Sequence, residues 1–147
     1  MAAPIDLSGS LKNKVSRIRV SSVLNKDVKQ FGKQHLLDGD EETCWNSDQG
    51  SNQWVILDFS EDVQVSEIWI QFQGGFVGKV CSLEKQDSSL NTFVNVYTFY
   101  PSDSGQTQIF KLPEPVKIST LKITFEQSTD LFGRITIYNL DIIGRSS

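Results

Sequence analysis

The sequence predicts an all-β protein, and three features support this fold class. Runs of β-branched and aromatic residues recur along the chain, either alternating with polar residues or continuous. Clusters rich in Pro, Gly, Asp and Ser, such as residues 101–105 and 113–115, are typical of turns between these runs. Helical spacing of apolar residues is confined to residues 27–36, where a glycine interrupts it. Strands separated by turns predict two antiparallel sheets that pack face to face.

The strand-forming runs follow one another without a linker or a repeat. In chain order they cover residues 18–24, 54–59, 65–72, 93–100, 109–112, 116–125 and 135–143. A chain of 147 residues is long enough for one domain with a sizeable core. No run falls in the first 14 residues, so we expect a flexible N-terminal tail (1–14) followed by a single domain (15–147).

An acidic turn, a tryptophan and a strand follow one another directly. The Asp-Gly-Asp sequence at 38–40 places two carboxylates around a glycine turn, and Thr43 and Trp45 come next. Residues 53–59 then form a mostly apolar run that predicts a strand with one wet and one dry face. This order resembles the discoidin domain, also called the coagulation factor V/VIII C-type domain, in which an Asp-Gly-Asp loop precedes a Thr-aromatic-Trp step and a Trp-containing strand.

The resemblance covers nearly the whole chain from about residue 15. It implies a discoidin-like (galactose-binding-like) jelly-roll β-sandwich of about eight strands, with the three tryptophans in the core or at its edge. A narrower resemblance, to a small stand-alone member of the family, rests on residues 41–50, 71–76 and 130–134. It implies a nuclear or cytoplasmic adaptor that associates with an orphan nuclear receptor and represses its transcriptional activity.

Three loops are candidates for partner binding: residues 46–52, 74–78 and 126–134. The resemblance places such loops at one end of the sandwich, where relatives bind sugars, lipids or protein segments. Aromatic residues and Arg are enriched at interface hot spots, and the loops hold both. The candidate partner-binding residues are Asn46, Asp48, Gln73, Phe76, Phe132 and Arg134. The alternative is that the two phenylalanines fold back over the end of the core.

The acidic turn raises the question of a calcium ion. Its spacing departs from an EF-hand, because the glycine and the closing glutamate of that loop are missing. The resemblance implies another calcium geometry, in which loop carbonyls, Asp38, Asp40 and Thr43 supply oxygen ligands together with a Glu from the last strand. Here that last position is Asn139. The alternative is that Asp38 and Asp40 only cap the loop by accepting backbone N–H hydrogen bonds.

Catalytic patterns are missing from the sequence. His35 is the single histidine, and with the two isolated cysteines, Cys44 and Cys81, it cannot form a four-ligand zinc set. Acidic and bulky neighbours of Cys44 raise a thiol pKa and so disfavour a nucleophilic cysteine. Phosphate-binding and serine-nucleophile motifs are absent too. We therefore expect a binding protein that is not an enzyme.

Charge and targeting signals narrow the partners. A net charge of −4 argues against nucleic acid, and no apolar run is long enough to span a membrane. The first ten residues lack the regions of a signal peptide, and we expect both cysteines to be free, so we expect a protein of the nucleus or cytoplasm. We also expect a monomer. Two other functions stay open: a carbohydrate-binding module, and a structural subunit of a larger intracellular complex.

Overall fold

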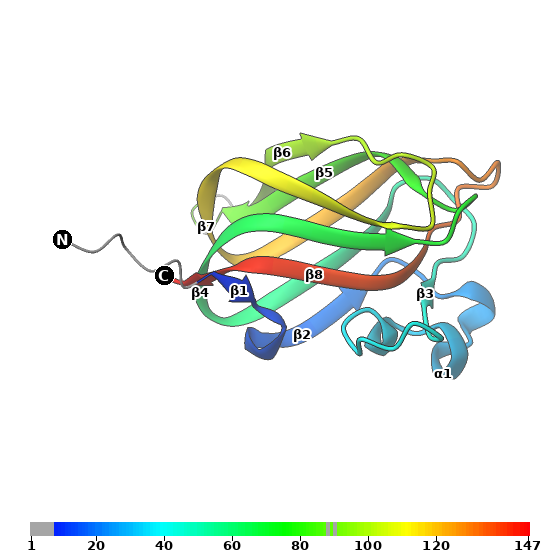
Figure 1. Ribbon diagram of the computed structural model, residues 1–147, viewed down its shortest axis with the longest axis horizontal. Helices are drawn as coiled ribbons and strands as arrows, with labels where there is room; N and C mark the ends of the chain where they lie inside the picture. The colour runs from blue at the N-terminus through cyan, green and yellow to red at the C-terminus, as the bar shows by residue number, and fades with distance from the viewer. Residues whose placement is uncertain (1–7, 88, 90) are drawn as a thin grey trace.

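A computed structural model describes residues 8–87, 89 and 91–147 of the chain (Figure 1). Its elements in chain order are β1 (Gly9–Ser10), η1 (Lys12–Lys14), β2 (Val15–Val20), η2 (Leu24–Lys26), α1 (Val28–Phe31), η3 (Lys33–His35), β3 (Trp45–Asn46), β4 (Gln53–Phe72), β5 (Gly78–Asp87), β6 (Thr92–Phe99), β7 (Thr107–Ser128) and β8 (Thr136–Ser146). The η elements are short 3₁₀ turns. All of the strand pairs are antiparallel, which confirms the predicted all-β class.

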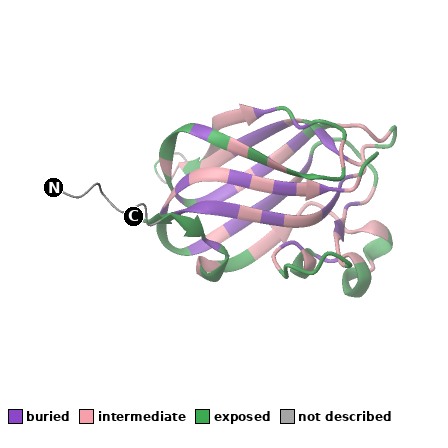
Figure 2. Ribbon diagram, viewed as in Figure 1, coloured by how far each residue is buried: buried purple, intermediate pink, exposed green. Residues whose placement is uncertain are grey.

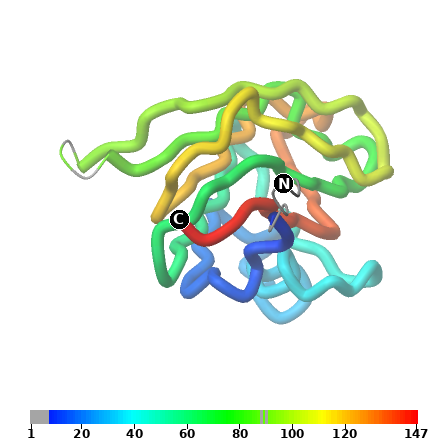
Figure 3. Tube along the Cα trace, turned by 60° about the vertical axis from the view of Figure 1, so that its left-hand side comes forward, coloured from blue at the N-terminus to red at the C-terminus, as the bar shows by residue number. Residues whose placement is uncertain are grey.

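The two longest strands, β4 and β7, each run through both layers of a sandwich (Figures 1 and 3). The first half of β4 pairs with the second half of β7, and β2, β5 and β6 widen this layer. The other halves of β4 and β7 pair with one another, and β8, with β1 and β3, widens the second layer. A break in the register between Asp58 and Val63 accompanies the bend of β4. The strands predicted at 54–59 and 65–72 are therefore two halves of one strand.

The segment 113–115, Pro-Glu-Pro, was predicted as a turn, and this prediction is wrong. The segment lies inside β7, where that strand bends. Pairing of β7 with β4 stops at Val116, opposite Val65, and resumes at Lys111, opposite Glu67. Since no residue of 112–115 has a partner in this ladder, the missing N–H groups of the two prolines cost no ladder hydrogen bond.

Strand β5 was missing from the predicted strands. Its sequence has a single β-branched residue, Val80, so local propensity does not indicate a strand. In the fold it lies between β6 and β7, and Cys81 and Leu83 are fully buried. Pairing on both sides, rather than propensity, makes this segment a strand.

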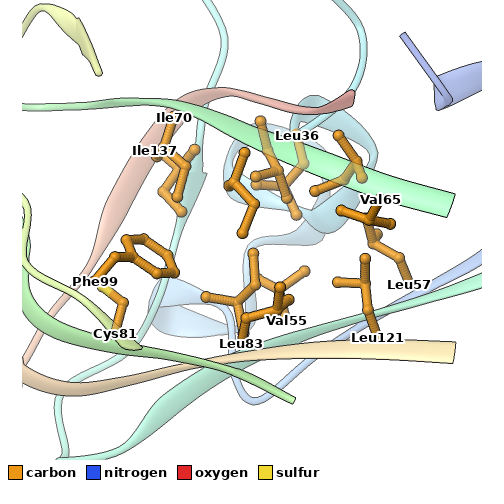
Figure 4. Packing of buried hydrophobic residues seen from close by; sticks show 14 of the residues in the cluster. Leu36, Val55, Leu57, Val65, Ile70, Cys81, Leu83, Phe99, Leu121 and Ile137 are labelled. Atoms are coloured by element: carbon orange, nitrogen blue, oxygen red, sulfur yellow. The ribbon is translucent and has the colours of Figure 1, made fainter. Parts of the chain in front are cut away.

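The core lies between the two layers. Buried and more exposed positions alternate along much of the strands (Figure 2). Val55 and Leu83 on one layer point toward Ile70 and Ile137 on the other (Figure 4). Interdigitation of two inner sheet faces is the usual way in which a β-sandwich buries its apolar side chains.

The three tryptophans lie where they were predicted, in the core or at its edge. Trp45 is fully buried, its ring centroid is 6.3 Å from that of Phe125, and its Nε1–H donates to the Ser22 carbonyl at 3.0 Å. Trp54 and Trp69 are half-buried. Trp45 thus ties the loop after the acidic turn to the core.

The predicted domain boundary at residue 15 is wrong for the described part of the tail. Strand β1 pairs with β8, and Leu11 is only 2% exposed. The N–H of Leu11 donates to the carbonyl of Ile142 at 2.8 Å. Residues 9–14 therefore belong to the domain, while the rest of the predicted tail, residues 1–7, lies outside the described residues.

The short helical turn predicted in residues 27–36 is present as α1, and η3 follows it; η2, which precedes it, was not predicted. The segment 24–35 flanks β2 in the view of Figure 1. Within the described ranges no helix has the length and apolar character needed to cross a membrane.

Candidate functional site

The three predicted loops meet at the end of the sandwich where β4 ends and β8 begins (Figure 1). The N–H of Gly50, in the first loop, donates to the carbonyl of Phe132, in the third, at 2.8 Å. The second loop is joined at the start of β8, because the N–H of Thr136 donates to the Phe76 carbonyl at 3.1 Å. Backbone hydrogen bonds of this kind hold the loops in one arrangement. We call the surface formed by Phe76, Leu131, Phe132 and Arg134 the end-loop surface.

Arg134 lies between two aromatic rings. Its guanidinium carbon is 5.2 Å from the ring centroid of Phe76 and 5.7 Å from that of Phe132. At these distances a cation is attracted to the negative face of a ring. The structure thus brings together three of the six predicted partner-binding residues.

Asp130 fixes the position of Arg134. The Nε and Nη2 atoms of Arg134 donate to the two carboxylate oxygens of Asp130 at 2.9 and 3.1 Å. The same carboxylate accepts the backbone N–H groups of Phe132 and Arg134 at 3.2 and 3.0 Å. The hydrogen bond from Arg134 is the largest influence that lowers the pKa of Asp130, and it raises the pKa of Arg134 in turn. Asp130 therefore remains ionised and holds the loop closed at neutral pH.

Gly133 is required for the turn between Phe132 and Arg134, whose N–H groups both donate to Asp130. Its φ is +83°, a conformation that residues with a side chain rarely adopt. A Cβ atom there would lie 2.5 Å from the carbonyl oxygen of Gly50. The close approach of residues 50 and 133 brings the first and third loops together.

The most exposed apolar side chains of this surface are Leu131, at 90%, and Phe132, at 57%. Both help to line a hollow of about 360 Å³ beside the end of β7. Phe76 is half-buried under Arg134. The alternative that the phenylalanines fold back over the core is therefore wrong for Phe132, and for Phe76 it stays a prediction.

Sequence reasoning missed two residues of the site. Leu131 was seen only as part of the third loop, although an apolar residue directly before Phe-Gly-Arg was a usable signal. Asp130 was missed as a positioning residue; the available signal was an Asp in a turn segment, because its short carboxylate accepts backbone N–H groups two residues on, here that of Phe132.

The other predicted partner-binding residues play different parts. Asn46 pairs with Thr136 in the β3–β8 ladder, and its buried Oδ1 has no hydrogen-bond partner among the described residues. The Asp48 carboxylate accepts the Gln49 N–H at 2.9 Å. The backbone of Gln73 closes the second loop, because its carbonyl accepts the N–H of Phe76 at 3.0 Å. These three residues shape the loops, and no described contact joins their side chains to Arg134.

The Asp-Gly-Asp loop forms a set of internal hydrogen bonds. Asp38 Oδ1 accepts the N–H of Asp40 at 3.0 Å, and Asp38 Oδ2 accepts the hydroxyl of Thr43 at 2.6 Å. Asp40 Oδ1 accepts the N–H of Glu42 at 2.9 Å. Burial raises the pKa of Asp38, but hydrogen bonds from Thr43, Asp40 and His35 outweigh it and leave this pKa below its ordinary value. The residues fit the capping role directly.

A calcium ion would use the same oxygens. Asp40 and Asn139 line one hollow of about 230 Å³, so the last strand does lie beside the loop. However, both Asp38 oxygens already accept hydrogen bonds, and the described residues contain no group of three or more His, Cys, Asp and Glu side chains placed to hold a metal. The amide at 139 adds no negative charge. The arrangement therefore fits a capped loop better than a calcium cage.

The candidate reactive groups lie apart from one another. Cys44 and Cys81 are both free, and burial raises the pKa of each thiol, which disfavours the nucleophilic thiolate. His35 contacts Asp38 Oδ2 through Nδ1 at 3.2 Å and the Lys29 carbonyl through Nε2 at 3.0 Å. The described hydrogen bonds of His35 include none to either cysteine, so the geometry provides no Cys–His dyad.

Comparisons with solved structures agree with this fold. The chain superposes on an F5/8 type C domain from Bacteroides fragilis with a TM-score of 0.80, at 11% identity over 95% of this chain and 98% of that one. It superposes on a family 32 carbohydrate-binding module from C. perfringens, solved with galactose, with a TM-score of 0.76, at 16% identity over 93% of this chain and 99% of that one. The predicted jelly-roll sandwich is confirmed.

Sequence relatives bear a single name, nuclear receptor 2C2-associated protein. The protein of that name from Danio rerio is 56% identical over 86% of this chain and 89% of its own length. The protein from Xenopus tropicalis is 53% identical over 92% of this chain and 98% of its own length. The protein from Homo sapiens is 49% identical over 86% of this chain and 89% of its own length. The F5/8 type C domain matches residues 17–138. Since this match spans most of the chain, the protein belongs to the F5/8 type C, or discoidin, domain family.

Proposed function

We propose that this protein is a non-enzymatic adaptor that binds an orphan nuclear receptor through the end-loop surface. The relatives support the kind of partner, because their name describes association with nuclear receptor 2C2. The observation that carries the choice of surface is the position of Arg134 between Phe76 and Phe132, next to the exposed Leu131.

The chemistry of the end-loop surface suits a protein partner. A few side chains supply most of the binding energy at a protein interface, and aromatic residues and Arg are enriched among them. Their contribution is larger when they are held rigidly before binding. Asp130 provides that rigidity by holding Arg134 at two atoms. The exposed ring of Phe132 and the side chain of Leu131 would then enter apolar hollows of the partner.

Repression of the receptor's transcriptional activity is the finer part of the proposal. An adaptor without catalytic groups represses by covering a surface that another protein needs, and this requires that it reaches the receptor in the nucleus or cytoplasm. Two free cysteines are in keeping with a reducing compartment. We propose a monomer that uses neither nucleic acid nor membrane as a partner, in line with the net charge of −4.

A carbohydrate is the second candidate ligand. The exposed ring of Phe132 beside Asn52 and Asp130 has the mixture of a ring and polar groups that sugars use. A solved neighbour of the same fold was determined in complex with galactose. If the protein is instead a subunit of a larger intracellular complex, the end-loop surface would bind another protein of that complex.

Calorimetric titration separates these candidates. The purified protein is titrated with purified nuclear receptor 2C2, with galactose and with N-acetylgalactosamine. The proposal expects saturable heat with the receptor alone, and a reporter gene driven by the receptor should fall when the protein is co-expressed. Saturable heat with a sugar and none with the receptor would replace the proposal by the carbohydrate candidate. Receptor binding without a fall in reporter expression would contradict only the repression part of the proposal.

A further inference from the structure

A groove runs along the free edge of β2. The only described strand that pairs with β2 is β4, so one edge of β2 is not extended by the sheet. On that side lies the segment 28–37, and two hollows of about 390 and 320 Å³ separate it from the strand. Lys33 and Gln34 line both hollows, which therefore adjoin. We call the two hollows together the β2 groove.

The outer wall of the β2 groove is held firmly. The Gln34 side chain donates to the Val28 carbonyl at 2.6 Å, and the Asp27 carboxylate accepts the N–H of Gln30 at 3.1 Å. Gly32 lets the chain turn here, because a Cβ atom at this position would overlap the Val28 carbonyl. A wall fixed by these contacts does not need to be ordered when a ligand binds, which lowers the entropic cost of binding.

The floor of the β2 groove is apolar. Val15, Ile18 and Leu37 line one hollow, and all three are only partly buried against the core. The other is lined by Val20, Val23 and Val28, and Val28 is 62% exposed. Each hollow therefore offers an apolar surface to one or more side chains of a ligand.

The charged side chains that line the β2 groove are all cationic. Arg17, Arg19 and Lys33 line it, and neither hollow is lined by an Asp or Glu, although the whole chain carries a net charge of −4. Arg19 is paired with Asp58 through Nη2 at 3.0 Å, yet its buried Nε has no partner among the described residues. Arg17 and Lys33 are exposed and make no ion pair in the part of the chain that the structure describes.

We propose that the β2 groove binds an acidic segment of a partner protein that carries two or more apolar side chains. The apolar side chains occupy the two hollows on either side of Lys33 and Gln34, and the carboxylates face Arg17 and Lys33. The apolar floor favours a peptide over a nucleic acid, whose recognition depends on phosphate contacts and on stacking against aromatic rings. The β2 groove shares no residue with the end-loop surface, so the inference goes beyond the proposed function: the adaptor has a second docking site.

Selection from a phage-displayed library of random peptides tests this without a known partner. Enriched peptides are synthesised with a fluorescent label, and their affinity is measured by anisotropy for the wild type, for Arg17→Glu/Lys33→Glu and for Val28→Asp. The matched controls are Arg145→Glu, an exposed cation outside the β2 groove, and Phe132→Ala on the end-loop surface. Positions 17, 28 and 33 are exposed, so thermal melting of the groove variants should match that of the wild type.

The proposal expects an enriched group of acidic peptides with at least two apolar residues. The double charge reversal and Val28→Asp should each weaken their binding by about 10-fold or more, and added salt should weaken it too. Both controls should leave it unchanged. The proposal is overturned if no enriched peptide depends on the groove residues, or if those that do lack acidic residues. A labelled oligonucleotide is measured in the same way. If it binds the wild type but not Arg17→Glu/Lys33→Glu, and no peptide depends on these residues, the proposal is also overturned and the groove is assigned to nucleic acid.

Discussion

Asp130 holds the guanidinium of Arg134 through two hydrogen bonds, from Nε at 2.9 Å and from Nη2 at 3.1 Å. Because the same carboxylate accepts two backbone N–H groups of its own loop, one side chain sets both the fold of the loop and the place of the cation. The exposed Phe132 depends on both. The end-loop surface is therefore expected to respond as a unit when Asp130 changes.

Replacing Asp130 by Asn should destabilise the loop in a pH-dependent way. The folded-state pKa of Asp130 is lowered, mainly by Arg134, so its stabilising contribution is complete above the unfolded value of about 3.9 and is lost as the pH falls through the lower folded value. Thermal melting of wild type and Asp130→Asn, measured from about pH 7 to about pH 2, should differ at neutral pH and converge in acid. A constant difference across the range would show that the ion pair does not contribute.

Leu11 should matter for stability although it precedes the domain boundary predicted from the sequence. Its side chain is 2% exposed and belongs to the core cluster. Leu11→Ala should lower the free energy of unfolding by about 2–5 kcal/mol, as for other buried leucines, in a denaturant titration. Lys12→Ala, at the exposed neighbouring position, is the control and should change it by less than about 0.5 kcal/mol. Equal free energies of unfolding for the two variants would contradict the assignment of residues 9–14 to the domain.

Asp38 should stabilise the acidic loop by capping. Removing its two hydrogen bonds in Asp38→Ala should cost about 1–2 kcal/mol in a denaturant titration, with or without a chelator. Millimolar calcium should leave the melting temperature of the wild type unchanged. A rise with calcium that Asp38→Ala abolishes would instead support the calcium site of Asp38, Asp40 and Thr43.

The two cysteines should react with a thiol reagent at different rates. Cys81 is fully buried and should be unreactive in the native protein, whereas Cys44 is partly exposed and should react slowly. Burial raises the pKa of both thiols, so the rate at Cys44 should increase only as the pH becomes alkaline. Denatured protein should give two thiols per chain. A Cys44–Cys81 bridge in protein made without oxidant would contradict this.

Local patterns in the sequence predicted most strands but not how they are joined. Runs rich in β-branched and aromatic residues at 54–59 and 65–72 were enough to find both halves of β4. That β4 and β7 each pass through both layers depends on pairing between distant residues, which no local pattern encodes. For the same reason β5, with its low propensity, was missed.

The candidate site was predictable in composition but not in geometry. Glycine-flanked Phe76 and the Phe-Gly-Arg sequence indicated exposed loop side chains. The sandwiching of Arg134, however, depends on contact between Gly133 and Gly50, which are 83 positions apart (133 − 50). The role of Asn46 likewise follows from long-range pairing, with Thr136.

The central claim is that the end-loop surface binds the receptor, and a single set of titrations tests it most directly. Phe76→Ala, Phe132→Ala and Arg134→Ala are titrated against purified nuclear receptor 2C2, with Tyr100→Ala as the control because Tyr100 is 70% exposed and lies in none of the three loops. Melting temperatures are measured alongside. The account predicts that Phe132→Ala weakens binding by about 2 kcal/mol or more, with little change in stability, and that Tyr100→Ala binds as the wild type does. Wild-type affinity in all three end-loop variants, or losses that only follow their loss of stability, would contradict it.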